Sequence, residues 1–166
     1  MSTGTIVRLA TPADSGAISD ILRVAFSEFK NDYTPEAYEV VTPPAAEIET
    51  RFAAGPQWIA LVDCKQVGTV SVYPEPDHLY IRSMAVLPEA RGLGVGMRLL
   101  DAIESYAVEA GFDRLFLHAT YFSTNAIGLY EKFGFEKTCD TTAEEWYGTP
   151  GLGMEKKLAR SQHAGG

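Results

Sequence analysis

The chain has 166 residues, enough for one domain with a buried core, and its 46% hydrophobic content excludes wholesale disorder. Its 22 acidic and 14 basic residues give a net charge of −8, which opposes nonspecific binding to nucleic acid or an anionic membrane. Two cysteines and three scattered histidines offer neither a disulfide framework nor metal-ligand spacing. With no export signal and no apolar run of about 18 residues, we expect a cytoplasmic protein without a metal.

Hydrophobic periodicity predicts strands and helices along the whole chain. We expect a first strand over residues 5–9 and a helix introduced by Pro12 and Asp14, with an apolar face. Residues 31–44 are rich in turn formers and form a candidate lid, and residues 46–54 are predicted as a short helix. Further strands are predicted at residues 58–63, 66–73, 79–86, 115–118, 135–138 and 152–158.

The most informative stretch is residues 84–100, M-A-V-L-P-E-A-R-G-L-G-V-G-M-R-L-L, where a strand ends, glycines follow and an amphipathic helix begins. A helix N-terminus supplies unpaired N–H groups and a partial positive charge, and Arg91 and Arg98 add formal charge. Glycines without a Cβ atom can take positive φ and let backbone amides approach an anion closely. Three residues have this role in the predicted pyrophosphate cradle: Gly92, Gly94 and Gly96.

Other phosphate-binding designs do not fit this stretch. A Walker loop requires G-x-x-x-x-G-K followed by Ser or Thr, and no such run occurs in the chain. A dinucleotide fingerprint requires G-x-G-x-x-G, whereas the glycines here run G-x-G-x-G. The alternative that remains is a glycine-rich connection without chemical consequence.

The segment V-L-P-E-A-R-G-L-G-V-G resembles the pyrophosphate-binding segment of the GNAT superfamily of N-acyltransferases, and R-G-L-G-V-G fits Arg/Gln-x-x-Gly-x-Gly/Ala. Residues 114–136 resemble the family's next strand and helix, L-x-V-x-x-x-N-x-x-A-x-x-L-Y-E-K-x-G-F. Ser123 stands where the family often has Asn, and Asn125 lies two residues too late to inherit that amide's role. The resemblance is specific over residues 79–136 and topological elsewhere.

The resemblance and the order of predicted elements imply one fold class. We expect an α/β (mixed α+β), GNAT-like three-layer fold, with a central mixed twisted sheet and helices on both faces. The fourth and fifth strands are expected to splay apart. Residues 1–158 are predicted to form a single acetyltransferase domain, and residues 159–166 a flexible C-terminal tail.

The family implies that acetyl-CoA sits between the splayed strands, where backbone groups pair with its pantetheine arm. It also implies that an N–H of the fourth strand stabilises the oxyanion, and that Tyr130 protonates the departing thiolate. A phenol with a reference pKa of about 10 is protonated at neutral pH; the alternative is that Tyr130 only packs its ring. The resemblance assigns acetyl-CoA binding to Met84, Ala85, Val86, Arg91, Gly92, Leu93, Gly94, Val95, Gly96, Ser123 and Tyr130.

The sequence leaves several candidates for the general base that deprotonates the acceptor amine. His78 starts the fourth strand on the same nominal face as Met84 and is our catalytic candidate, beside a water chain without a dedicated base. His118 is expected to be structural, and Arg82 either orients an acceptor carboxylate or pairs with a neighbouring acid. Four carboxylates are alternatives for the base: Asp77, Glu28, Glu144 and Glu145.

Acceptor selection is expected from residues 31–44 and 141–151, whose aromatic side chains suit an apolar or aromatic substrate. The candidate substrate-binding residues are Tyr33, Tyr38, Tyr80 and Trp146. The expected reaction is transfer of an acetyl group from acetyl-CoA to the primary amine of a small or amino-acid-like acceptor by direct attack on the thioester. The alternatives are a protein N-terminal acetyltransferase and a non-catalytic acyl-CoA sensor, and a homodimer stays open.

Overall fold

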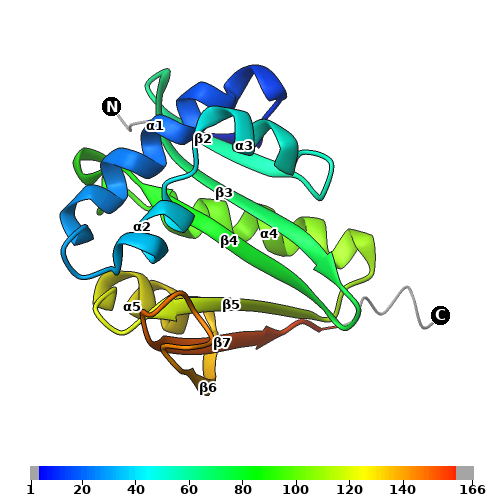
Figure 1. Ribbon diagram of the computed structural model, residues 1–166. Coiled ribbons are helices and arrows are strands. Elements are labelled where there is room, and N and C mark those ends of the chain that lie inside the picture. Colours follow the sequence, from blue (N-terminus) through cyan, green and yellow to red (C-terminus); the bar gives the residue numbers. More distant parts are fainter. Residues whose placement is uncertain (1–3, 160–166) are drawn as a thin grey trace.

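The strands form a single sheet because their apolar side chains are covered on both faces. In the computed structural model, which describes residues 4–159, the strand order is β1-β2-β3-β4-β5-β7-β6 (Figure 1). All neighbouring strands are antiparallel except β4 and β5. This mixed sheet confirms the predicted fold class. The strands are β1 (Thr5–Leu9), β2 (Gln57–Val62), β3 (Lys65–Glu75), β4 (His78–Val86), β5 (Arg114–Thr120), β6 (Glu136–Thr141) and β7 (Gly151–Lys157).

Helices cover both faces of the sheet (Figure 1). On one face α1 packs over β3 and β4 and against α3, with α2 beside it, and on the other face α4 crosses the central strands and contacts α5. Helix α4 buries Leu99, Ile103 and Ala107 at helical spacing, which is the apolar face predicted from the sequence. The helices are α1 (Ser15–Phe26), α2 (Pro35–Val41), α3 (Ala45–Arg51), α4 (Val95–Ala110) and α5 (Thr124–Phe133).

One segment differs from the prediction. Residues 31–44 were expected to form a loop, but they contain α2, which starts with Pro35 at its first position. The Thr34 hydroxyl caps this helix by accepting a hydrogen bond from the Ala37 N–H at 3.1 Å. The segment is also tied down, because the Thr34 hydroxyl donates to the Tyr147 carbonyl at 2.5 Å. The domain boundary at residue 158 stays a prediction, and residues 1–3 and 160–166 lie outside the described residues.

The parallel strands β4 and β5 separate after a short contact. They pair only at residues 79–81 and 115–117, and beyond this point they diverge (Figure 1). A β-bulge in β4 begins at the same place: Ser71 faces Arg82 and Thr69 faces Ala85, so two β4 residues oppose one residue of β3. Ser83, one of the two, has a φ of 56°. The expected splay is therefore present, and the edge of β4 at residues 82–86 has no ladder with β5.

Candidate active site

Two cavities meet where β4 and β5 diverge. The first, here called the aromatic cavity, has a volume of about 290 Å³ and lies between β4, β5 and the connection from β6 to β7. The second, here called the glycine cavity, has a volume of about 610 Å³ and lies between β4, the glycine turn, α4 and α5. Five residues line both cavities and so mark their junction: Phe26, Met84, Ser123, Ala126 and Tyr130.

The glycine turn opens toward the glycine cavity. Gly92 and Gly94 have φ values of 83° and 81°, and a Cβ atom at either would meet no atom within 4 Å. These two glycines therefore allow the left-handed backbone conformation of the turn. They also leave space beside the first turn of α4, whose N-cap is Gly94. Gly96 differs from the prediction, since it lies within α4 without a positive φ. A Cβ atom there would approach Leu129 Cδ2 to 2.6 Å, so Gly96 allows close packing of α4 on α5.

The other predicted acetyl-CoA residues occupy different positions around this cavity. Met84, Ala85 and Val86 line it along the β4 edge. Arg91 also lines it, but its guanidinium is held by Glu28 at 2.6 Å and by the Val86 carbonyl at 3.3 Å. Val95 and Ser123 are lining residues as well.

Three details around the glycine cavity differ from the sequence-based picture. Leu93 is not among the lining residues and its side chain is 50% exposed. Asn125, to which no role was transferred, does line the cavity. Ser123 holds the N-cap position of α5 without a capping side-chain hydrogen bond, because its hydroxyl pairs with that of Thr120 at 2.7 Å. Asn125 lies two residues after the position at which the family often has Asn, so aligning the sequence with the family motif could not identify it as a lining residue.

Tyr130 lies at the junction of the two cavities, on α5. Its ring packs edge-on against Phe135 at a centroid distance of 5.7 Å, and only 8% of the residue is exposed. Within residues 4–159 its hydroxyl makes no hydrogen bond, so it is available to a ligand. Burial, followed by the nearby Tyr33 phenol, raises the pKa of Tyr130 above its ordinary value. The phenol is therefore a proton donor at neutral pH.

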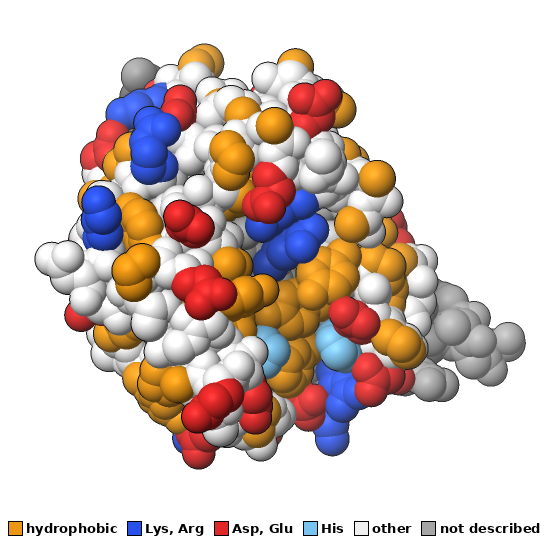
Figure 2. All heavy atoms as spheres, viewed as in Figure 1, with side chains coloured by type: hydrophobic (Ala, Val, Ile, Leu, Met, Phe, Trp, Pro, Cys, Tyr) orange, Lys and Arg blue, Asp and Glu red, His pale blue; other side chains and the backbone are white. Residues whose placement is uncertain are grey.

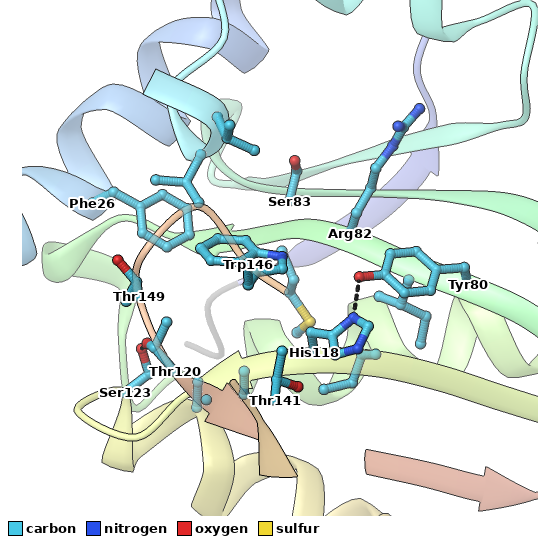
Figure 3. A pocket seen from close by; sticks show the side chains of 18 of the residues that line it. Phe26, Tyr80, Arg82, Ser83, His118, Thr120, Ser123, Thr141, Trp146 and Thr149 are labelled. Atoms are coloured by element: carbon cyan, nitrogen blue, oxygen red, sulfur yellow. Dashed lines mark hydrogen bonds between the residues drawn. The ribbon is translucent and has the colours of Figure 1, made fainter. Parts of the chain in front are cut away.

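The aromatic cavity contains a paired phenol and imidazole. Tyr80 on β4 and His118 on β5 point toward one another, with 2.7 Å between the Tyr80 hydroxyl and His118 Nδ1 (Figure 3). Burial lowers the pKa of His118 below 6.5, so the imidazole is neutral at pH 7. The cavity lining in the described part of the chain includes no carboxylate side chain. Among the lining side chains of the described residues, His118 is thus the one that can accept a proton near neutral pH.

The histidine expected as base is in a different place. His78 lies at the start of β4, before the strands separate, and lines neither cavity. Its Nδ1 contacts the Asp77 carboxylate at 2.7 Å. The prediction relied on alternation along β4, whereas the pairing of β4 with β5 decides which histidine reaches the cavity. The structure therefore favours His118, which the sequence had suggested was structural.

Three of the four candidate acceptor-binding residues line the aromatic cavity, and one does not. Tyr33, Tyr80 and Trp146 all line the aromatic cavity, with Trp146 across from β4 and β5 (Figure 3). Tyr38 does not line it, because α2 directs its ring against Tyr33, at 6.3 Å, and beneath the Lys30 ammonium. The Tyr33 phenol is buried, which raises its pKa to about 12.

Two arginines complete the wall of the aromatic cavity. Arg82 precedes the bulge on β4, and Arg51 ends α3 and donates to the Ser83 hydroxyl at 2.8 Å. Figure 2 shows basic side chains bordering an apolar hollow in the centre of this face. Sequence reasoning considered Arg82 but missed Arg51, which reaches the site through the tertiary packing of α3 against α1.

A mixed sheet that splits between two parallel strands, with a glycine turn at one opening and an aromatic cavity at the other, is the architecture of the acyl-CoA-dependent N-acetyltransferases. The sequence match agrees: the model of the acetyltransferase (GNAT) family matches residues 18–135. The chain belongs to the GNAT acetyltransferase family.

Individual relatives support this assignment. YjgM of Escherichia coli, described as an uncharacterized N-acetyltransferase, is 29% identical over 137 residues, covering 79% of this chain and 81% of that protein. Other curated N-acetyltransferases match about half of this chain and less than half of their own length.

Solved structures share the fold. A GCN5-related N-acetyltransferase of Rhodopseudomonas palustris is 25% identical with a TM-score of 0.76, covering 95% of this chain and 99% of that one. The PaiA N-acetyltransferase of Thermoplasma acidophilum, solved in complex with coenzyme A, is 18% identical with a TM-score of 0.76, covering 93% and 99%. Within residues 4–159 no helix is long and apolar enough to cross a membrane, and no group of three metal-ligating side chains occurs.

Proposed function

We propose that the protein transfers an acetyl group from acetyl-CoA to the primary amine of a small molecule. The observation that carries this proposal is the junction of the two cavities at Tyr130. A thioester that enters from the glycine cavity meets an amine that enters from the aromatic cavity at this point. Direct transfer between two bound substrates needs this arrangement, because proximity replaces a bimolecular encounter.

The glycine cavity suits the coenzyme A part of the donor. The open space beside Gly92 and Gly94 and the first amides of α4 fit a pyrophosphate, and the free β4 edge at residues 84–86 fits an amide-bearing arm. The complex of the Thermoplasma acidophilum relative with coenzyme A supports this reading. We propose that Leu93 contributes only its backbone and that Arg91 contacts the donor after exchanging its partner Glu28.

The residues at the junction suit proton transfer. Acetyl-CoA supplies the activated acyl group. The neutral His118 accepts the proton of the acceptor ammonium, through the Tyr80 hydroxyl or a water molecule, so that a free amine attacks. Backbone N–H groups left without β5 partners at the bulge, residues 83–84, are proposed to donate to the acyl oxygen. The Tyr130 phenol protonates the sulfur that leaves, and the surplus proton of the attacking nitrogen restores the phenol. This assignment replaces His78 as the base.

The test is a screen of amines with acetyl-CoA that follows thiol release and identifies the product by mass. Calorimetry with acetyl-CoA in the absence of acceptor is run alongside. We expect binding of acetyl-CoA and turnover of at least one small primary amine. Turnover limited to peptide N-termini would establish the alternative of a protein N-terminal acetyltransferase. Binding without turnover of any acceptor would favour the acyl-CoA sensor.

A further inference from the structure

Arg82 in the aromatic cavity forms no direct ion pair within the described residues, and Glu47, which pairs with Arg51, is the carboxylate whose charge acts on it. Its buried Nε atom has no hydrogen-bond partner there. Its guanidinium lies over the Tyr73 ring, 4.6 Å from the centroid. Leaving a buried donor unpaired is costly. The Nε atom is covered by protein, so a ligand in the cavity would pair with the terminal nitrogens of the guanidinium, which form no hydrogen bond within the described residues either.

A second guanidinium increases the positive charge at this place. The Arg51 side chain is 11% exposed and donates to the Ser83 hydroxyl. Its one acidic contact is Glu47, at 3.5 Å, and that carboxylate is itself 54% exposed. Burial, followed by the charge of Arg82, lowers the pKa of Arg51, which indicates that the two guanidiniums are close and incompletely neutralised. The local charge is therefore positive in a chain whose net charge is −8.

The rest of the lining sets the chemistry of the ligand. Tyr73, Tyr80 and Trp146 provide aromatic surfaces, and no carboxylate lines this cavity within the described residues. Arg82 directly precedes the bulge, and its side chain extends from β4 away from the Tyr80–His118 pair (Figure 3), so an anion that it holds lies on the side of the cavity formed by β4 and Arg51. A carboxylate fits the two-pronged donor geometry of a guanidinium. The glycine cavity, which suits the pyrophosphate, opens on the other side of the junction.

We propose that the acceptor carries a carboxylate beside its amino group, as an α-amino acid with an apolar or aromatic side chain does, and that Arg82 binds this carboxylate with Arg51 in support. The amino group then points to the junction at Tyr130, and the side chain lies against Tyr80 and Trp146. This inference rests on the proposed N-acetyltransferase activity and specifies its substrate class.

The experiment compares matched acceptors that differ only at the carboxylate. Phenylalanine is tested against phenylalaninamide and phenethylamine, and leucine against leucinamide and isoamylamine. Rates are expressed per concentration of unprotonated amine, because removing the carboxylate changes the basicity of the amino group. We expect kcat/KM to be about 10- to 100-fold higher for the amino acid than for its amide, the range of charged hydrogen bonds.

Variants test whether Arg82 causes the preference for the amino acid over its amide. In Arg82→Gln the ratio of kcat/KM between the amino acid and its amide is expected to fall to about 1, through a higher KM for the amino acid, while the KM for acetyl-CoA changes little. Arg82→Lys keeps the charge without the planar fork and is expected to retain part of the advantage. Arg23→Gln, at an exposed position on α1 whose ion pair is with Asp20, is the control and should behave as the wild type.

Each outcome separates this inference from the proposed function. Amides or simple amines that react as well as the amino acids would overturn the carboxylate proposal and leave the N-acetyltransferase proposal standing. The same holds if Arg82→Gln keeps the preference for the amino acid. If no member of either set reacts, the amino-acid proposal fails, and the wider amine screen alone decides the proposed function.

Discussion

Replacing Tyr130 by Phe tests the central catalytic proposal, because it removes one oxygen and keeps the ring. The ring contact with Phe135 survives, and the hydroxyl makes no hydrogen bond within the described residues, so no partner is orphaned. We therefore expect the free energy of unfolding to change by less than about 1 kcal/mol. Acetyl-CoA affinity should also be nearly unchanged, since the proposed mechanism places the Tyr130 hydroxyl at the sulfur end of the donor only.

The expected kinetic effect is large. General-acid catalysis contributes about 10²- to 10⁴-fold, which corresponds to about 3–5 kcal/mol of barrier. The measurement is a single-turnover rate with enzyme in excess over acetyl-CoA, because slow product release masks part of the loss in steady-state kcat. The matched control is Tyr106→Phe on α4, whose ring packs against Trp58 and lines neither cavity. An unchanged single-turnover rate in a folded Tyr130→Phe protein would eliminate the general-acid role.

Three further predictions concern the turn, the base and the fold. Gly94→Ala places a Cβ atom at a φ of 81°, at a cost of about 1–2 kcal/mol, and should weaken acetyl-CoA binding in calorimetry, whereas Gly16→Ala within α1 should not. Because burial lowers the pKa of His118, kcat/KM expressed per concentration of unprotonated amine should fall only at acid pH, where His118 becomes protonated, and His118→Asn should lower the rate and abolish that fall; an unaltered pH profile would exclude His118 as the base. Asp14→Ala removes the bond from the Thr11 N–H and the ion pair with Arg8, and should lower the free energy of unfolding by about 1–2 kcal/mol at pH 7. The Arg8 guanidinium holds the pKa of Asp14 at about 2, below its ordinary 3.8, so this stabilisation is complete above 3.8 and should disappear from denaturation curves as the pH falls through about 2.

Local spacing was enough to predict most of the framework. The strands and α4 follow from alternation and from the helical period, and the glycine turn follows from its position between a strand and a helix. Helix α2 was missed although Thr34 and Pro35 form a start signal, since a helix of two turns has a weak apolar pattern of its own. Its stability comes from the cap and from the hydrogen bond to Tyr147, which is far away in the sequence.

The residues of the aromatic cavity were harder to predict because they come together through long-range pairing. His118 and Tyr80 meet because β5 pairs with β4 in one register, and a shift by one residue would turn His118 to the other face. Arg51 reaches the bulge because α3 packs against α1, which covers β3 and β4. Composition and motif spacing do not reveal either contact, so the sequence-based prediction chose His78 as the base and treated His118 as structural.

The glycine turn and the proposed acid are coupled through one close contact. Gly96 has no side chain where a Cβ atom would approach Leu129 Cδ2 to 2.6 Å, so α5 can lie directly against the first turn of α4. Leu129 immediately precedes Tyr130, and both line the glycine cavity. The helix that offers its N-terminus to a pyrophosphate therefore also sets the distance at which the Tyr130 hydroxyl stands from the β4 edge. The third glycine of R-G-L-G-V-G thus serves the contact between α4 and α5, and the proposed position of the Tyr130 acid depends on that contact.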